Sequence, residues 1–341
     1  MDANSVTGAQ ENIQDFDLVN RIIDAYVLAV ETDFGRNFWV EVFGPMKAPI
    51  HDAIVARDHA AVTQLLREPH SNMLFEGFEI LKQDFPNFAD FKALNASTAY
   101  DALLVFAEAI GALRLEYPEG YQLNQVPPNP IAVEDVLSAL DRMLGLKLEF
   151  PNPYPNENGL VTERGIVSYR AVQSAYQGYR IASLAREYGG CVAEIGGGLG
   201  RTAFYSRLFG VRDYSIVDIP MSSVAQSYFL GRTLGDQALR LFGETPRASM
   251  NLIPPSEFFS DGRFYGLIVN VDSLPEISGE MSDQYITHIS SHTTRFLSIN
   301  HEVAVHSHKT VRDVALANKG RSLSRTPYWL RRGYVDELFA F

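Results

Sequence analysis

In the stretch "VAEIGGGLGRTA", four glycines stand within five positions, at Gly196, Gly197, Gly198 and Gly200. The apolar run before them is typical of a buried strand, and it carries one acid, Glu194. Glycine has no Cβ and costs conformational entropy, so such a cluster indicates that something lies very close to the backbone. In an open α/β sheet the turn after the first strand is the usual ligand platform, and we therefore expect a nucleotide-like ligand here.

Two phosphate-binding turns fit this pattern poorly. A dinucleotide fingerprint requires G-x-G-x-x-G, and Arg201 stands where its third glycine should fall. A P-loop requires Gly-Lys-Ser/Thr, which does not follow the glycines. An acid, Asp218, ends the strand-like run "YSIVDI" 22 residues after Gly196, a spacing that suits one helix and one strand. A nucleotide-like ligand that uses neither of these two phosphate-binding turns remains compatible with the pattern.

These residues resemble the cofactor-binding turn of class I S-adenosylmethionine-dependent methyltransferases. The resemblance implies that Glu194, the four glycines and Asp218 bind S-adenosyl-L-methionine, with Asp218 accepting hydrogen bonds from the ribose hydroxyls. It also implies an α/β fold with a Rossmann-like sheet in which the strands run in the order 3-2-1-4-5-7-6. Asp272, at the end of the expected fourth strand, is a further candidate for cofactor binding.

Longer stretches of the chain are similar to the sugar O-methyltransferases of bacterial polysaccharide and natural-product gene clusters. They include "NPYPNENGLVTERGIVSYRA", "YSIVDIPMSSVAQSYFL" and "RTPYWLRRGYVDELF", together with the more specific "NVDSLPE" and "SINHE". The similarity covers about residues 75–341. It implies that the chain transfers a methyl group to a hydroxyl of a small-molecule sugar or glycoside.

Methyl transfer to an alcohol requires in-line alignment of the reacting atoms and a group that receives the hydroxyl proton. The acceptor is expected beside the cofactor, past the ends of the fourth and fifth strands. His301 is the first candidate for the general base, because an imidazole is neutral and receptive near pH 7. Asp272 could orient that base, bind the sugar or act as the base itself, and Glu302 is the remaining catalytic candidate.

A metal is the alternative way to activate the hydroxyl. Asp272, Glu276 and Glu302 could hold Mg²⁺ through oxygen ligands and so lower the pKa of the hydroxyl, although no compact acidic motif requires it. The residues that we expect to contact the acceptor are Arg170, Tyr176, Glu276 and Asn300. Arg170 and Tyr176 lie on the helix before the first strand, where a surface ion pair and a packed aromatic ring are equally good explanations of them.

The chain divides at a stretch rich in proline and asparagine. Residues 149–165 favour a linker or a lid loop between a helical N-terminal region, 1–150, and a methyltransferase domain, 151–341. We expect the N-terminal region to cap the acceptor pocket. Apolar residues at helical spacing predict the N-terminal helices, which we place at 16–34, 51–69, 97–118 and 129–146. Pro130 is expected in the first turn of the last of these helices.

From residue 167 onward the pattern predicts a helix and then strands that alternate with helices, which indicates a parallel sheet. The first, second, fourth and fifth strands are expected in "CVAEI", "DYSIVDI", "FYGLIVNVD" and "RFLSINHE". The third is expected in "ALRLFGE", at residues 238–244. The last 20 residues read as a terminal antiparallel hairpin.

Composition narrows the class of protein. The net charge of −12, with no Lys/Arg run before Arg331, argues against nucleic acid as a partner. One cysteine, Cys191, fits a reducing compartment, and neither a secretory signal nor a membrane-spanning run is visible, so we expect a cytoplasmic protein. The apolar N-terminal helices are compatible with a homodimer.

Other functions remain open at this point. A phenol or polyketide O-methyltransferase also pairs a helical region with such a glycine turn. A non-catalytic S-adenosylmethionine-binding protein that serves a partner is an alternative of another class, although the polar residues at the strand ends favour an enzyme. An NAD-dependent oxidoreductase is disfavoured by Arg201.

Overall fold

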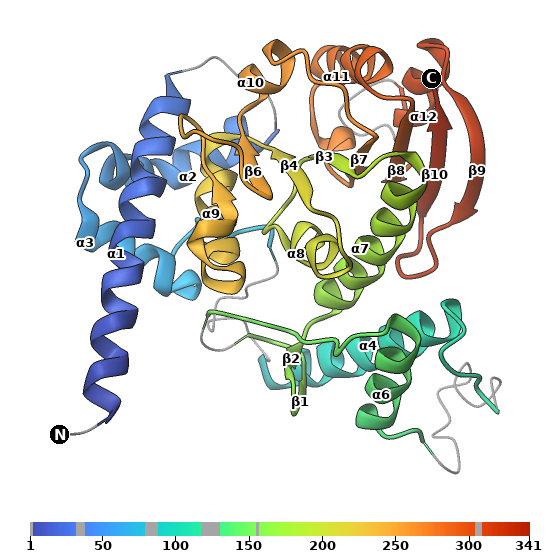
Figure 1. The fold of residues 1–341 in the computed structure, drawn as a ribbon, viewed down its shortest axis with the longest axis horizontal. Helices are drawn as coiled ribbons and strands as arrows, with labels where there is room; N and C mark the ends of the chain where they lie inside the picture. Colours follow the sequence, from blue (N-terminus) through green and yellow to red (C-terminus); the bar gives the residue numbers. More distant parts are fainter. Residues whose placement is uncertain (1–2, 32–37, 79–87, 117–129, 155–156, 304–308) are drawn as a thin grey trace.

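A computed structural model describes residues 3–31, 38–78, 88–116, 130–154, 157–303 and 309–341 (Figure 1). Its centre is an eight-stranded sheet in the order β5-β6-β4-β3-β7-β8-β10-β9. In chain order these strands are β3 (Cys191–Ile195), β4 (Asp213–Val217), β5 (Leu239–Arg240), β6 (Met250–Ile253), β7 (Leu267–Val271), β8 (Arg295–His301), β9 (Arg321–Pro327) and β10 (Tyr334–Ala340). All neighbours pair in parallel except β10, which is antiparallel to β8 and to β9.

Apart from the edge strand β5, the sheet has the predicted order, since numbering the other strands along the chain gives 3-2-1-4-5-7-6. The third strand was predicted wrongly. Only Leu239–Arg240 of the segment 238–244 is a strand, and it lies at the edge of the sheet. The third position belongs to β6, whose four residues are all buried. It includes Asn251, an amide that can be buried because it donates to the carbonyl oxygens of Tyr214 and Ala248.

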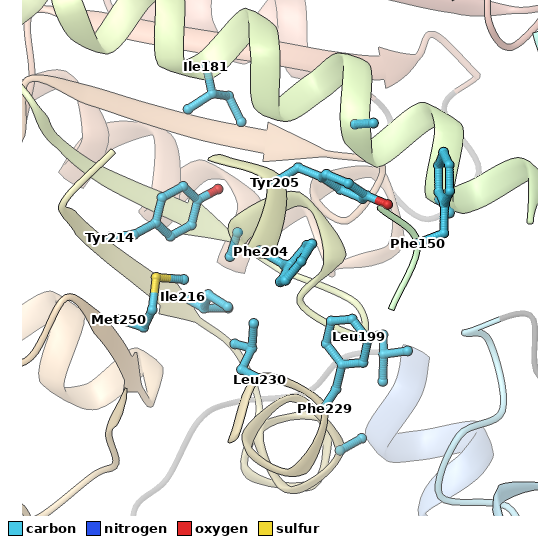
Figure 2. Packing of buried hydrophobic residues seen from close by; sticks show 14 of the residues in the cluster. Phe150, Ile181, Leu199, Phe204, Tyr205, Tyr214, Ile216, Phe229, Leu230 and Met250 are labelled. Atoms are coloured by element: carbon cyan, nitrogen blue, oxygen red, sulfur yellow. The ribbon is translucent and has the colours of Figure 1, made fainter. Parts of the chain in front are cut away.

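Alternate residues of the strands enter two separate cores. On one face, Val192 and Ile216 pack with α7 (Tyr169–Tyr188), α8 (Arg201–Leu208) and α9 (Pro220–Leu234), as Figure 2 shows around Phe204 and Leu230. On the other face, the core contains residues of α10 (Pro255–Ser260), α11 (Gly279–His292) and α12 (Val311–Ala317). Burial on both faces explains why these strands are continuous apolar runs in the sequence.

The N-terminal helices pack on the sheet domain in two groups (Figure 1). The helix α1 (Ala3–Val30) lies against α9, with α2 (Phe38–Val55), α3 (His59–Arg67) and the short η1 (Pro69–Ser71) beside it. The helix α4 (Phe88–Ala109), followed by α6 (Val133–Leu144), lies against α7. Both groups share one hydrophobic cluster with α7, α8 and α9. This cluster contains residues from both sides of residue 150, so the division into two domains remains a prediction.

Polar contacts fix the first group in place. The carboxylate of Asp15 on α1 is 3% exposed and accepts hydrogen bonds from Arg67 of α3 and Arg232 of α9. Arg21 of α1 binds Glu244 and the carbonyl oxygen of Leu239, beside the edge strand β5. A buried carboxylate with two guanidinium partners is well compensated, and it requires all three helices to keep their positions.

Several helix boundaries differ from the predicted ones. The predicted helix 51–69 is two helices, because Asp58 caps α3 by accepting a hydrogen bond from the Ala61 amide, while Arg57 has a left-handed backbone. The predicted helix 97–118 is α4, which begins earlier and contains Thr98, whose hydroxyl donates to the Leu94 carbonyl oxygen. Pro130 precedes α6 and is not in its first turn.

The segment 149–165 contains part of a β-hairpin. Part of it is β1 (Leu160–Thr162), which pairs with β2 (Gly165–Val167) as an antiparallel hairpin, while residues 155–156 lie outside the described residues. Arg164 anchors the hairpin by donating to Asp141 of α6. Within the described ranges, no helix combines the length and the apolar character that a membrane crossing requires.

Candidate functional site

The glycine turn joins β3 to α8 and adopts left-handed backbone angles, with φ of 72° at Gly196, 55° at Gly198 and 92° at Gly200. A Cβ on Gly196 would lie 2.2 Å from the Oγ of Ser273, so this glycine is required by the contact with the loop after β7. At Gly198 the nearest atom to such a Cβ is 4.0 Å away, on Phe78. Packing therefore explains Gly196, whereas Gly198 leaves an open concavity at the end of the sheet.

Gly197 and Gly200 face protein rather than open space. A Cβ on Gly197 would lie 2.6 Å from Cγ2 of Ile216, and one on Gly200 would lie 3.1 Å from Leu230. Gly200 is the N-cap of α8. Of the four glycines, Gly196 and Gly198 line the cavity described below, and the other two bring the turn close to β4 and α9.

Asp218 stands at the end of β4 and is bound to the glycine turn. One carboxylate oxygen accepts from the Gly197 amide at 3.0 Å and from Nε2 of Gln226 at 2.6 Å, and the other accepts from the Ile219 amide at 2.8 Å. Burial raises the pKa of this carboxyl to about 6, although the hydrogen bonds that it accepts oppose the shift. The carboxylate is therefore oriented by the protein before any ligand binds.

A cavity of about 180 Å³ opens beyond the carboxyl ends of β3, β4 and β7. The crevice between α1 and α9 is far smaller, at about 20 Å³. The predicted residues that line the larger cavity are Arg170, Gly196, Gly198, Asp218, Asp272 and Glu276. The carboxyl ends of parallel strands are where ligands bind in open α/β sheets, so the site lies where the fold places ligands.

The N-terminal region contributes residues to the same cavity, and the sequence analysis did not single out these residues. Lys47 of α2 lines it, together with Glu76, Gly77 and Phe78 from the segment after η1. The Lys47 side chain is buried, and its ammonium donates to the Leu74 carbonyl oxygen at 3.5 Å. Burial lowers the pKa of Lys47, while the negative charges of Asp218 and Glu76 oppose that shift.

Asp272 follows β7 in a left-handed conformation, with φ of 58°. Its amide donates to the Ile299 carbonyl oxygen and to Oδ1 of Asn300. Its carboxylate accepts from Arg331 at 2.5 Å and from the Tyr334 hydroxyl at 2.7 Å. Left-handed backbone in a residue other than glycine is costly, and here the surrounding contacts hold it so that Asp272 lines the cavity.

Arg331 and Tyr334 were not predicted as site residues. Both belong to the turn between β9 and β10 and its continuation, and the Arg331 guanidinium lies 4.0 Å from the centroid of the Tyr334 ring. Burial and the charge of Asp272 raise the pKa of the Tyr334 hydroxyl, which therefore stays a hydrogen-bond donor. The sequence feature that could have pointed to these two residues was the cluster of arginine and tyrosine in "YWLRRGY".

Two of the predicted catalytic residues do not line the cavity. His301 packs edge-on against Tyr334 at 5.6 Å, and its Nδ1 accepts a hydrogen bond from the Val303 amide. In the neutral ring Nε2 then carries the hydrogen, so neither nitrogen has a lone pair available for a substrate proton. Glu302 is exposed and forms a two-pronged ion pair with Arg325 of β9.

Of the three predicted magnesium ligands, Asp272 and Glu276 line the cavity and Glu302 does not. Asp272 is engaged by Arg331 and Tyr334, and Glu302 is engaged by Arg325. Among the residues that the structure describes, no group of three or more His, Cys, Asp or Glu side chains is placed to hold a metal ion. The expectation of a site formed by Asp272, Glu276 and Glu302 is therefore not met.

Three other predicted residues are not among those that line the cavity. Glu194 is 1% exposed and accepts from the Tyr214 hydroxyl at 3.0 Å, and burial raises its pKa to about 8. Asn300 is buried, donates a hydrogen bond to Ser298 and accepts one from the Asp272 amide. Tyr176 packs between Phe106 and Trp329, as expected for a core aromatic ring.

No family model matches the chain, and no curated protein matches it. Among solved structures, the glycopeptide N-methyltransferase MtfA complexed with S-adenosyl-L-methionine is 13% identical, with a TM-score of 0.39 and coverage of 49% of this chain and 94% of its own. Magnesium protoporphyrin IX methyltransferase from Synechocystis PCC 6803 is 15% identical, with a TM-score of 0.34 and coverage of 50% and 80%. The methyltransferase domain of a bacterial Hen1 is 12% identical, with a TM-score of 0.37 and coverage of 50% and 99%. Each of these three matches covers about half of this chain.

Proposed function

We propose that the chain is an S-adenosylmethionine-dependent O-methyltransferase that acts on a hydroxyl of a sugar or glycoside. The observation that carries the cofactor assignment is that Gly198 and Asp218 line one cavity beyond the sheet. Gly198 leaves the room that a Cβ would fill, and Asp218 presents a pre-oriented carboxylate. A nucleoside cofactor without phosphates needs both the space at Gly198 and the carboxylate of Asp218. Its ribose hydroxyls donate to the carboxylate, while the rest of the molecule lies against the backbone of the glycine turn.

Bound at this turn, S-adenosyl-L-methionine supplies an electrophilic methyl group on a sulfonium. The chain then has to position an acceptor hydroxyl in line and receive its proton. Asp272 is the catalytic candidate that lines the cavity, and we propose it as the group that accepts the hydroxyl proton. Arg331 and Tyr334 fix its carboxylate, while Arg170 and Glu276 are proposed to contact the acceptor.

The preference for a sugar rests on the sequence motifs and on the chemistry around Asp272. Carboxylate, guanidinium and phenol groups meet there, and these are partners that a polyhydroxylated acceptor can satisfy. The N-terminal helices are proposed to cap the cavity, since Lys47, Glu76 and Phe78 belong to its wall. We propose the segment 149–165 as the connection between this cap and the sheet domain.

The test is calorimetric titration of the wild-type protein and of Asp218→Ala with S-adenosyl-L-homocysteine. Micromolar binding that the variant loses is the expected result. Binding of NAD instead, or no binding by folded wild-type protein, would overturn the proposal. Incubation with S-adenosyl-L-methionine and separate panels of glycosides and phenols, read by product mass, then tests the acceptor class.

A further inference from the structure

Gln226 is a fully buried glutamine of α9 that is not among the residues lining the cavity. A primary amide is costly to bury unless it has hydrogen-bond partners. Its Nε2 donates to the Gly198 carbonyl oxygen at 2.9 Å and to Oδ2 of Asp218 at 2.6 Å. Both partners line the cavity, so one buried side chain connects the two residues on which the cofactor assignment depends.

The two acceptors determine which way the amide of Gln226 faces. A carbonyl oxygen and an ionised carboxylate only accept hydrogen bonds, so the NH₂ end of the amide has to lie against both of them. The Oε1 of Gln226 is buried and has no hydrogen-bond partner among the described residues. An unpaired buried oxygen costs free energy, which indicates that the residue serves the two contacts of its Nε2.

The helix α9 carries Gln226 to the glycine turn. It begins directly after the strand end that carries Asp218, with Pro220 in its first turn, and Gln226 lies eight positions beyond Asp218. The helix is held in turn by α1, because Arg232 of α9 donates to the buried carboxylate of Asp15 at 2.6 Å. The amide is therefore presented to the turn by a helix with a fixed position.

Donation from Gln226 favours the charged form of Asp218. Burial raises the pKa of this carboxyl, and the hydrogen bond from Gln226 opposes that effect, as do hydrogen bonds from Ile219, Gly197 and Ser222. Among the described residues, the titratable groups that interact electrostatically with Asp218 are Lys47 of α2, Glu194 of β3 and Tyr285 of α11. Of the side-chain donors, Gln226 is the one that also binds the glycine turn.

We infer that Gln226 is a positioning residue of the cofactor site, which ties the Asp218 carboxylate to the glycine turn in the ionised form that ribose hydroxyls need. The inference rests on the proposed function and deepens it, because it assigns a residue that controls the cofactor pocket from behind its wall. Gln226 acts through Asp218 and Gly198 and makes no contact with the ligand.

The experiment measures the affinity for S-adenosyl-L-homocysteine by calorimetry at pH 8.5, 7, 6 and 5. Gln226→Met keeps an unbranched side chain of similar length and removes its donors. At pH 8.5, where Asp218 is ionised in both proteins, the variant should bind about 3-fold more weakly or less. At pH 6 the loss should grow to about 10-fold, because Asp218 of the variant takes up a proton at higher pH.

Proton release gives a second readout of the same effect. The dependence of the binding enthalpy on the buffer should be greatest near pH 6 for the wild-type protein and about one pH unit higher for Gln226→Met. If Gln226→Met does not fold, Gln226→Leu replaces it.

The matched control is Gln177→Met, the same substitution at another buried glutamine. Gln177 lies on α7, donates to the Tyr328 hydroxyl and accepts from Thr202, so its loss also removes two hydrogen bonds. We expect a lower free energy of unfolding, measured in urea, with the same pH dependence of binding as the wild-type protein. A merely structural role of Gln226 would give this result as well.

The outcomes are separable. Binding by Gln226→Met with the wild-type pH dependence overturns the inference alone, as does an equal change of the pH dependence in Gln177→Met. Wild-type affinity that is constant between pH 8.5 and pH 5 also overturns it, since the ionisation of Asp218 would then not control binding. Folded wild-type protein that binds no S-adenosyl-L-homocysteine overturns the proposed function and the inference with it.

Discussion

Arg331 donates a hydrogen bond of 2.5 Å to Asp272, joining the turn after β9 to the end of β7. This contact holds the Asp272 carboxylate at the wall of the cavity. Replacing Arg331 with Met should lower kcat/KM for methyl transfer about 10- to 100-fold, because a hydrogen bond between charged groups is lost. The affinity for S-adenosyl-L-homocysteine should change less than about 3-fold.

The matched control for that variant is Arg332→Met, which changes the exposed neighbour in the same turn. Steady-state kinetics and calorimetry on both variants distinguish a loss of the positioning of Asp272 from a general disturbance of the fold. Equal kinetic losses in the two variants would mean that the turn as a whole matters and that the contact between Arg331 and Asp272 does not.

Asp272 and His301 are the two candidates for the general base. Asp272 lines the cavity, whereas Nδ1 of His301 is occupied by the Val303 amide. We expect Asp272→Asn to lower kcat about 10²- to 10⁴-fold, the range for general acid–base groups, and to keep the affinity for S-adenosyl-L-homocysteine within about 3-fold. His301→Gln should cost less than about 10-fold. The reverse ranking in single-turnover kinetics would restore His301 as the base.

Gly196 and Gly198 should respond differently to alanine. Gly196→Ala places a Cβ against Ser273 and strains a left-handed residue, so we expect a loss of about 2–4 kcal/mol in the free energy of unfolding. Gly198→Ala carries only the backbone strain, about 1–2 kcal/mol, because its Cβ would meet open space.

For cofactor affinity we expect the opposite order, with Gly198→Ala more harmful than Gly196→Ala. The methyl group of Gly198→Ala occupies the concavity, so the folded variant should bind S-adenosyl-L-homocysteine at least about 10-fold more weakly. Urea denaturation measures the first quantity and calorimetry the second. Unimpaired binding by Gly198→Ala would show that the cofactor does not approach this part of the turn.

Cofactor affinity should depend on pH through Asp218. Its pKa of about 6 means that the carboxyl is ionised at pH 7.5 and becomes protonated as the pH falls through 6. Ribose hydroxyls donate to the charged form, so binding lowers this pKa, and the affinity for S-adenosyl-L-homocysteine should fall about 10-fold between pH 7 and pH 5. Binding at pH 6 should release protons, which makes the measured enthalpy depend on the ionisation enthalpy of the buffer.

The control for this pH dependence is Asp218→Asn, which has no proton to exchange at that position. Its weaker binding should be flat between pH 5 and pH 7 and insensitive to the buffer. A pH profile shared by the variant and the wild-type protein would assign the titration to another group.

Local patterns made much of the fold predictable. The strands β3, β4, β7 and β8 are apolar runs with clear stops, and the glycine turn and Asp218 lie at sequence-adjacent ends of such strands. The strand β6 escaped detection because it has four residues and includes Asn251, whose burial depends on the Tyr214 carbonyl oxygen. No feature of the sequence near Asn251 indicates that its hydrogen-bond partner lies on another strand.

The rest of the site depends on contacts between distant segments. Arg331 is 59 positions from Asp272, and Lys47 enters from α2. His301 was ranked first for its imidazole and its place at a strand end, whereas the Val303 amide after β8 donates to its Nδ1 and occupies that lone pair. The left-handed backbone of Asp272 is likewise set by its contacts with β8 and is not visible in its residue type.

The hydrophobic cluster shared by α1, α4 and the helices α7 to α9 has a consequence for cooperativity. The helices before and after residue 150 bury each other's apolar faces, and separating them would expose these faces to water. The two halves of the chain should therefore unfold in a single thermal transition. A fragment that begins at residue 151 would expose the surfaces of α7 and α9 that α4 and α1 cover. It should aggregate on expression or bind hydrophobic dyes, because the N-terminal helices bury the apolar surfaces of α7 and α9.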